Sequence, residues 1–162
     1  MTTHRKLQLG GEDIDDALVN YIVSDCKSRG INLDVTNDKL RKRLRLICKR
    51  AKKQLTKFTS TRIDIEFISL GRHYGLKLLR PKFEEIVRPI LEKTLRAIKI
   101  CMFRSNLTKN DVDTVVLVGG SARIPLVQSL LADFFGSGKI NCPNNPAVQV
   151  VNGAIVYASK LN

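Results

Sequence analysis

The chain has 162 residues, which favours one compact domain or two small lobes. No apolar run is long enough for a transmembrane helix and the first residues lack the apolar core of a secretory leader, so we expect a cytoplasmic protein that does not act in a membrane. Lys and Arg number 28 against 15 Asp and Glu, and the net charge of +13 favours acidic partners.

The cysteine pattern argues against a structural metal site. Four cysteines are present, none in a C-x-x-C motif, and neither histidine lies near any of them in the sequence. Zinc sites use closely spaced Cys and His ligands, so no metal ligands are predicted. We expect four free thiols in a reducing compartment: Cys26, Cys48, Cys101 and Cys142.

The first half of the chain begins with two predicted helices. "GGEDIDDALVNYIVSDCKSRG" has an apolar face at helical spacing and ends at Gly30. Residues 39–57 carry ten basic residues and no acid, and they also show an apolar face, so we expect a basic amphipathic helix. The two predicted faces are Ile14, Leu18, Ile22 and Cys26 in the first helix, and Leu40, Leu44, Ile47, Ala51 and Leu55 in the second.

A strand and a long helix follow. "TRIDIEFISL" alternates apolar and charged residues, which predicts a strand with one solvated face. "GRHYG" is typical of a turn, and the repeat in "RPKFEEIVRPILEKTLRAIK" predicts a helix that Pro89 should kink or split. "ICMFRSNLTKND" is predicted to be a loop.

The last third contains an apolar strand followed by two glycines. Residues 115–118 are apolar on both faces, as in a parallel sheet that is covered on both sides, but few partner strands are evident. A helix over "PLVQSLLADFFG", a loop over "GSGKINCPNNP" and a final helix over "AVQVVNGAIVYASK" complete the predicted order α, α, β, α, β, α, α.

Two features have both a structural and a functional interpretation. A strand followed by Gly-Gly and a helix can form a ligand-binding corner, or it can be a tight turn that binds nothing. The basic helix can present a solvated face or a surface for phosphate or nucleic acid. It has no aromatic residue before Phe58, which argues against base stacking. No set of residues typical of a catalytic site is present.

Five segments, in this order and spacing, resemble the 70-kDa heat shock protein chaperones: "LGGEDIDDALVNYI", "RLRLICKRAKKQLT", "LLRPKFEEIVRPILEKTLR", "VVLVGGSARIPLVQSLLADFF" and "INCPNNPAVQVVNGAIVYA". "VGGSARIP" is similar to a signature of that family. The resemblance covers nearly all of the chain but only the second half of the family's ATPase domain. It implies an α/β, actin-like ATPase fold, second lobe only, with the outer subdomain at 1–80 and an incomplete inner subdomain at 81–162.

The resemblance also implies a site for ATP or ADP. The matching residues for the adenosine are Gly119, Gly120, Ser121, Arg123 and Ile124 on one wall and Lys52, Lys53 and Thr56 on the other. In the family, nucleotide exchange factors and co-chaperones are partners, and the outer subdomain contacts the exchange factors.

The departures from the family pattern limit what this chain is expected to do alone. The family's two phosphate-binding hairpins, its catalytic lysine and its magnesium-organising aspartates lie upstream of the matched region, so we predict no catalytic residue and no ATP hydrolysis here. Magnesium is expected only in a complete domain. Lys49 replaces a glutamate, Lys53 an adenine-stacking arginine and Ala147 an acid, so ATP or ADP binding is expected to be weak or absent.

Three functions therefore remain open from the sequence. The first is a fragment or truncated member of a chaperone ATPase domain that supports ATP-dependent protein folding in a full-length context. The second is a non-enzymatic module whose basic surface binds exchange-factor-like or acidic partners. The third, a nucleic-acid-binding protein, is the one that the residues favour least. The strand at 115–118 is also expected to keep an exposed edge that favours association.

Overall fold

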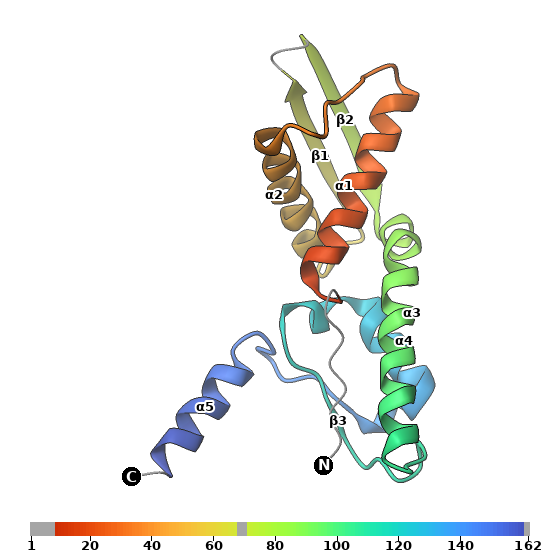
Figure 1. Ribbon diagram of the computed structural model, residues 1–162, viewed down its shortest axis with the longest axis vertical. Helices are drawn as coiled ribbons and strands as arrows, with labels where there is room; N and C mark the ends of the chain where they lie inside the picture. The colour runs from red at the N-terminus through yellow and green to blue at the C-terminus, as the bar shows by residue number, and fades with distance from the viewer. Residues whose placement is uncertain (1–8, 68–70, 161–162) are drawn as a thin grey trace. The chain divides into compact units, whose positions relative to one another are not determined.

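The computed structural model describes residues 9–67 and 71–160. The chain forms two compact units, Gln8–Ile90 and Leu91–Asn162, and the long helix α3 (Arg80–Arg104) contains the boundary between them. Helices and strands are labelled in Figure 1. Each unit has its own core and is considered by itself.

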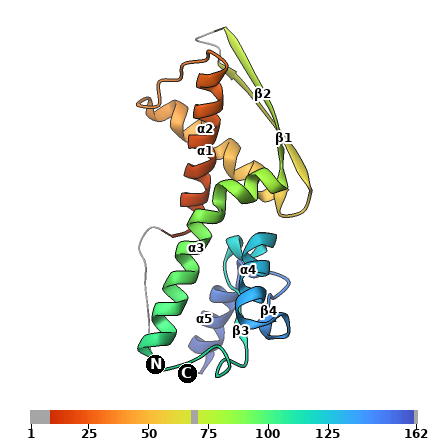
Figure 2. The same cartoon turned by 90° about the vertical axis from the view of Figure 1, so that its right-hand side faces the viewer.

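The Gln8–Ile90 unit is a β-hairpin with two helices on one face. Strands β1 (Ser60–Phe67) and β2 (Arg72–Leu79) are antiparallel, in a register that runs from Ser60 opposite Leu79 to Phe67 opposite Arg72. Helices α1 (Gly11–Ser28) and α2 (Asp38–Leu55) lie on the same side of this hairpin (Figure 2). The core between the layers contains Ile14, Leu18, Ile22, Leu44, Leu55, Ile63, Ile65, Tyr74 and Leu78.

Local chemistry explains where these helices begin. The Asp13 carboxylate accepts a hydrogen bond from the Gly10 amide (2.7 Å) at the start of α1, and the Asn37 side chain accepts from the Lys39 and Leu40 amides at the start of α2. Such caps satisfy amides that have no partner within the helix. The two helices predicted from the sequence are therefore confirmed.

Two predictions about this unit and the long helix are wrong. Of the segment predicted to be a turn, only Gly71 is a turn residue, and residues 72–75 lie within β2, a strand that was not predicted. Helix α3 continues to Arg104 through residues predicted to be a loop. Pro89 lies inside α3, so of the predicted kink or split the split does not occur. Pro89 is exposed, so the carbonyl that loses its amide partner can face water. The end of the predicted strand at residues 68–70 lies outside the described residues.

The Leu91–Asn162 unit is smaller than the Gln8–Ile90 unit, and more of its large apolar side chains are exposed to solvent. Strand β3 (Val115–Val116) pairs in parallel with β4 (Ile140–Asn141), and α4 (Pro125–Phe135) packs on them through Leu131 and Phe135. The predicted strand is thus shorter than 115–118, and its partner lies in a segment predicted to be a loop. The expectation that both faces are covered is also wrong, because Val116 and Val118 are more than half exposed.

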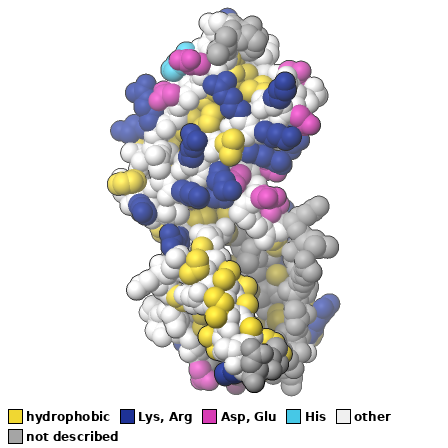
Figure 3. Space-filling view, turned by 90° about the vertical axis from the view of Figure 1, so that its left-hand side faces the viewer, with side chains coloured by type: hydrophobic (Ala, Val, Ile, Leu, Met, Phe, Trp, Pro, Cys, Tyr) yellow, Lys and Arg dark blue, Asp and Glu magenta, His cyan; other side chains and the backbone are white. Residues whose placement is uncertain are grey.

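Helix α5 (Gln149–Ser159) completes the second unit. It was predicted from the sequence, but none of its residues is buried. Figure 3 shows apolar side chains gathered on the surface of this unit, whereas Lys and Arg side chains gather on the Gln8–Ile90 unit.

Candidate functional site

The predicted Gly-Gly corner connects β3 to α4. Its path runs from Leu117 through Gly119 into a short 3-10 turn, η2 (Gly120–Arg123), and then into α4 at Pro125. Leu117 and Ala122 belong to the buried core of the unit and anchor the corner to it, and Ile124 is also buried. Ile124, which was predicted to contact the adenosine, is 1% exposed as a whole residue, so neither its side chain nor its backbone is open to a ligand in this structure.

The two glycines differ in their physical role. Gly119 has φ +88°, a conformation that residues with a Cβ rarely adopt, and its amide donates to the Pro146 carbonyl at 2.7 Å. A Cβ built on Gly119 or Gly120 would meet no described atom within 4 Å. Close packing within the described chain therefore does not explain the Gly-Gly pair, and the corner is open on the side where these Cβ atoms would lie.

Arg123 is held in place by a residue that the sequence reasoning did not select. Its Nη2 donates to Asn145 Oδ1 at 2.8 Å, and the side chain is exposed. Gln128 Nε2 donates to the Ala122 carbonyl at 2.9 Å, and it lies 3.6 Å from Cys142 Sγ. The segment 141–146 thus contacts the corner through Asn145, which binds Arg123, and Pro146, whose carbonyl binds the Gly119 amide. The only sequence signal for Asn145 was its place beside proline in "CPNNP", which was interpreted as a loop.

The α2 residues predicted to contact nucleotide have unequal surroundings. Lys52 Nζ lies 2.7 Å from Asp15 Oδ1 and donates to the Gly11 carbonyl at 2.6 Å, and both ionised side chains are about one-tenth exposed. The distance between Lys52 Nζ and Asp15 Oδ1 is that of a charge-assisted contact between ammonium and carboxylate. Lys52 is therefore already engaged in the link between α1 and α2.

Lys53 and Thr56 lie at the end of α2. Lys53 is exposed, and Thr56 Oγ1 donates back to the Lys53 carbonyl at 2.8 Å. Arg80 fixes this end of the helix because its guanidinium donates to the Leu55 and Phe58 carbonyls at 2.9 and 2.8 Å. The structure thus brings Lys52, Lys53 and Thr56 together in one unit, and the residues of the Gly-Gly corner together in the other.

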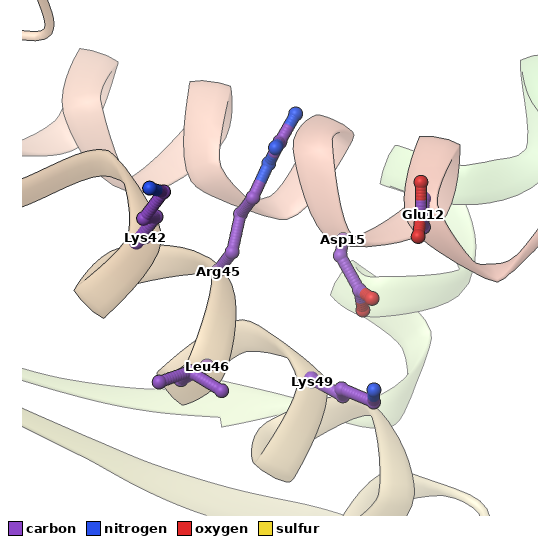
Figure 4. Close-up of a pocket in the computed structure, with 6 residues that line it drawn as sticks. All are labelled: Glu12, Asp15, Lys42, Arg45, Leu46 and Lys49. Atoms are coloured by element: carbon purple, nitrogen blue, oxygen red, sulfur yellow. The ribbon is translucent and has the colours of Figure 1, made fainter. Parts of the chain in front are cut away.

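A groove lies beside the predicted α2 residues. It has a volume of about 370 Å³ and is lined by side chains of α1 and α2 (Figure 4): Glu12, Asp15, Lys42, Arg45, Leu46 and Lys49. Arg45 binds Asp16 through two hydrogen bonds of 2.6 and 2.7 Å, and these hydrogen bonds hold the pKa of Asp16 below its usual value. Sequence reasoning did not select this groove, because it depends on how α1 and α2 pack.

The described residues do not offer a metal centre. Within 9–67 and 71–160, no three His, Cys, Asp or Glu side chains gather in a way that could hold a metal ion. None of the four cysteines forms a disulfide within the described residues, as the sequence predicted, and the cellular compartment stays a prediction. No helix in this part of the chain is long and apolar enough to cross a membrane.

Comparison with known proteins identifies the family. A family model described as "Hsp70 protein" matches residues 1–162. The chain belongs to the Hsp70 family.

Several curated Hsp70 relatives are much longer than this chain. A heat shock 70 kDa protein of Trichophyton rubrum is 35% identical over 96% of the chain and 24% of its own length. A mitochondrial heat shock 70 kDa protein of Pisum sativum is 40% identical over 94% of the chain and 23% of its own length, and a ribosome-associated molecular chaperone of Nakaseomyces delphensis is 35% identical over 99% and 26%. The chain therefore spans about a quarter of the length of these relatives.

Membership of the Hsp70 family confirms the resemblance drawn from the sequence. It implies the actin-like ATPase fold, and the mixture of helices and short strands agrees with an α/β class. It also makes this chain an Hsp70 chaperone-family domain whose full-length members bind nucleotide and magnesium. The assignment to the second lobe, its two subdomains and the nucleotide-contacting residues stay predictions.

Proposed function

We propose that this chain is the adenosine-binding part of an Hsp70 ATPase domain and serves ATP-dependent chaperoning in a full-length protein. The observation that carries the proposal is the open Gly119–Gly120 corner with an exposed arginine fixed beside it. A nucleoside presents a flat base and a polar sugar. An open glycine backbone allows close approach of the sugar, and a guanidinium can stack on the base.

The Arg123–Asn145 contact supports this role. A guanidinium that is already oriented loses less conformational entropy when a base stacks on it. The Asn145 side chain accepts a hydrogen bond from Arg123 and orients it. Ala147 stands where the family pattern has an acid after Asn-Pro, so this position offers Arg123 no carboxylate. Ser121, half-buried beside Arg123, is proposed as a contact for the sugar.

The α2 residues are proposed as contributors on the strength of the resemblance. Lys53 and Thr56 have exposed or half-exposed side chains that could reach a ligand. Lys52 would first have to leave Asp15 and the Gly11 carbonyl, so we propose that it acts by holding α1 against α2. We assign no magnesium ligand, because the described residues form no cluster suited to one.

The test is a titration of the 162-residue chain with ADP and adenosine, followed by ¹⁵N NMR. We expect shifts at Gly119–Arg123 and a dissociation constant above about 100 μM, because few contacts offset the cost of binding. Arg123→Ala should weaken adenosine binding roughly fivefold. Arg96→Ala, which removes an exposed arginine elsewhere in the same unit, should not. Absence of shifts at the corner at millimolar adenosine, or equal effects of both variants, would overturn the proposal.

A second candidate function is a non-enzymatic module that binds acidic partners through the Gln8–Ile90 unit. The observation that favours it is the excess of positive charge on α2 that the fold leaves uncompensated. Arg45 and Lys52 have carboxylate partners, but Lys42, Lys49, Arg50 and Lys53 form no ion pair with any described residue. Exchange factors and co-chaperones, with which Hsp70 proteins work, are the proposed class of partner.

A further inference from the structure

The groove between α1 and α2 has a definite charge pattern. Its α2 wall carries Lys42 and Lys49, which are exposed and form no ion pair within the described chain. Its α1 wall carries Glu12 and Asp15 (Figure 4). Asp15 forms an ion pair with Lys52, and Arg45 forms one with Asp16. The charged groups that remain available to a partner are therefore Lys42 and Lys49 on one wall and Glu12 on the other.

The spacing of the free groups matches a helix. Lys42 and Lys49 are seven positions apart on α2, which places them about 10 Å apart along one face. Leu46 lies between them and is 59% exposed, although it belongs to a helix whose opposite face is fully buried. A third helix laid along the groove would meet a lysine, an apolar contact and a second lysine at the one-heptad spacing that helices share.

We propose that this groove docks an acidic amphipathic helix, which places an apolar side chain on Leu46 and carboxylates at one-heptad spacing on Lys42 and Lys49. The inference rests on the second proposed function, the binding of acidic partners by the Gln8–Ile90 unit, and it names the kind of partner that binds there. A basic residue near Glu12 would fix the direction of the docked helix.

The same contacts disfavour nucleic acid as the occupant. Glu12 leaves a negative charge on the wall opposite the lysines, which acts on phosphates and on a partner's carboxylates alike, so the choice of occupant rests on the other lining residues. No aromatic side chain lines the groove, so bases have nothing to stack on, and the exposed Leu46 has no use in a phosphate contact.

The experiment uses the 162-residue chain and a fluorescein-labelled helical peptide whose face has glutamate, leucine and glutamate at one-heptad spacing. Fluorescence anisotropy should show binding that weakens as salt is raised. The double variant Lys42→Glu/Lys49→Glu should weaken binding at least about tenfold. The matched control Arg72→Glu/Lys77→Glu makes the same charge change at exposed positions of β2 and should change binding by less than about threefold.

Two further measurements separate charge from shape. A peptide with lysines in place of both glutamates should bind the Lys42→Glu/Lys49→Glu variant but not the wild type. Exchanging the charges on both partners would then restore the interaction. Leu46→Ser should weaken the original peptide about threefold or more without altering the salt dependence. Circular dichroism of every variant verifies that the helices are retained.

The outcomes distinguish the two levels of the proposal. If no acidic peptide binds the wild type at low salt, or if a nucleic-acid duplex binds through Lys42 and Lys49 in its place, the second proposed function and this inference both fail. If the peptide binds but the groove and hairpin variants weaken it equally, the acidic-partner function stands and the docking groove is wrong. Groove-specific loss with recovery by charge exchange supports both.

Discussion

Burial lowers the reactivity of two of the four thiols, Cys26 and Cys48, because it raises their pKa. Burial raises the pKa of Cys26 to about 11, and the neighbouring Asp25 adds to this effect. Burial likewise raises the pKa of Cys48 to about 12, with Asp15 and Asp16 adding to it. The thiolate is the reactive form, so both groups should be unreactive at neutral pH.

We therefore expect a native chain at pH 8 to react with a thiol reagent mainly at Cys101 and Cys142, which are half-buried. Cys26 and Cys48 should react only after denaturant is added. At pH 8 both groups are almost fully protonated, so raising the pH toward 10 should increase their very small thiolate fraction by about tenfold per pH unit, whereas an ordinary thiol with a pKa of about 8.5 is already almost fully ionised at pH 10. Absorbance of the released chromophore gives the number of reacted thiols, and peptide mass mapping identifies them. Rapid labelling of all four in the native state would contradict the prediction.

The same thiols show what periodicity can predict at the level of the residue. The first helix was predicted with Cys26 on its apolar face, and Cys26 is buried. In the basic helix the predicted face included Ile47, whereas the fully buried face is formed by Leu44, Cys48, Ala51 and Leu55. Ile47 and Cys48 are adjacent, and the packing of α2 against both α1 and β1 places Cys48 in the core and leaves Ile47 half-buried.

At the scale of the element, the contact between α1 and α2 depends on a polar pair near their ends. Lys52 and Asp15 are almost buried, and removing one partner of such a pair leaves an uncompensated charge in the interior. We expect Lys52→Ala to lower the free energy of unfolding by about 3 kcal/mol. Lys53→Ala, one position further and exposed, should change it by less than about 0.5 kcal/mol.

Urea denaturation followed by circular dichroism measures this difference. The double variant Asp15→Asn/Lys52→Met removes both charges and should recover most of the stability that Lys52→Ala loses. Equal midpoints for Lys52→Ala and Lys53→Ala would show that Lys52 does not hold α1 against α2. Lys52 would then be free to serve the nucleotide role that the family resemblance suggested.

Strand β2 shows why some elements could not be predicted from the sequence. The two glycines of "GRHYG" suggested a turn, and only Tyr74 and Leu78 of the strand are buried, so the strand lacks a clear alternation. Gly75 lies opposite Asp64, and a Cβ there would be 3.3 Å from Asp64 Oδ1. The glycine marks a close cross-strand approach, which becomes visible only once β1 and β2 are paired.

The candidate site could be predicted in part for a similar reason. The "VGGSARIP" motif identified the corner because its glycine conformation and its anchoring residues are local in sequence. Asn145 and the groove between α1 and α2 were missed because they depend on segments that are distant in the chain. Assignment of Lys53, Thr56 and Arg123 to one nucleotide site rests on the family pattern and not on local geometry.

At the scale of the whole molecule, the net positive charge and the exposed apolar surface should have opposite effects on self-association. Helix α5 has no charged residue between Gln149 and Ser159 and buries none of its side chains. Five large apolar residues on it are 55–68% exposed: Val150, Val151, Ile155, Val156 and Tyr157. A helix that is apolar on all sides is normally covered, and an exposed patch of this kind favours association.

We therefore expect the chain to self-associate in a concentration-dependent manner, as sedimentation velocity would show. The net charge of +13 makes copies repel, so association should strengthen as salt screens the repulsion. Binding of an acidic helix to the groove should change in the opposite direction with salt. Val151→Glu/Ile155→Glu should keep the chain monomeric, whereas Val35→Glu/Leu79→Glu, at exposed apolar positions of the Gln8–Ile90 unit, should not. A wild-type chain that stays monomeric at high concentration and high salt would show that α5 does not drive association.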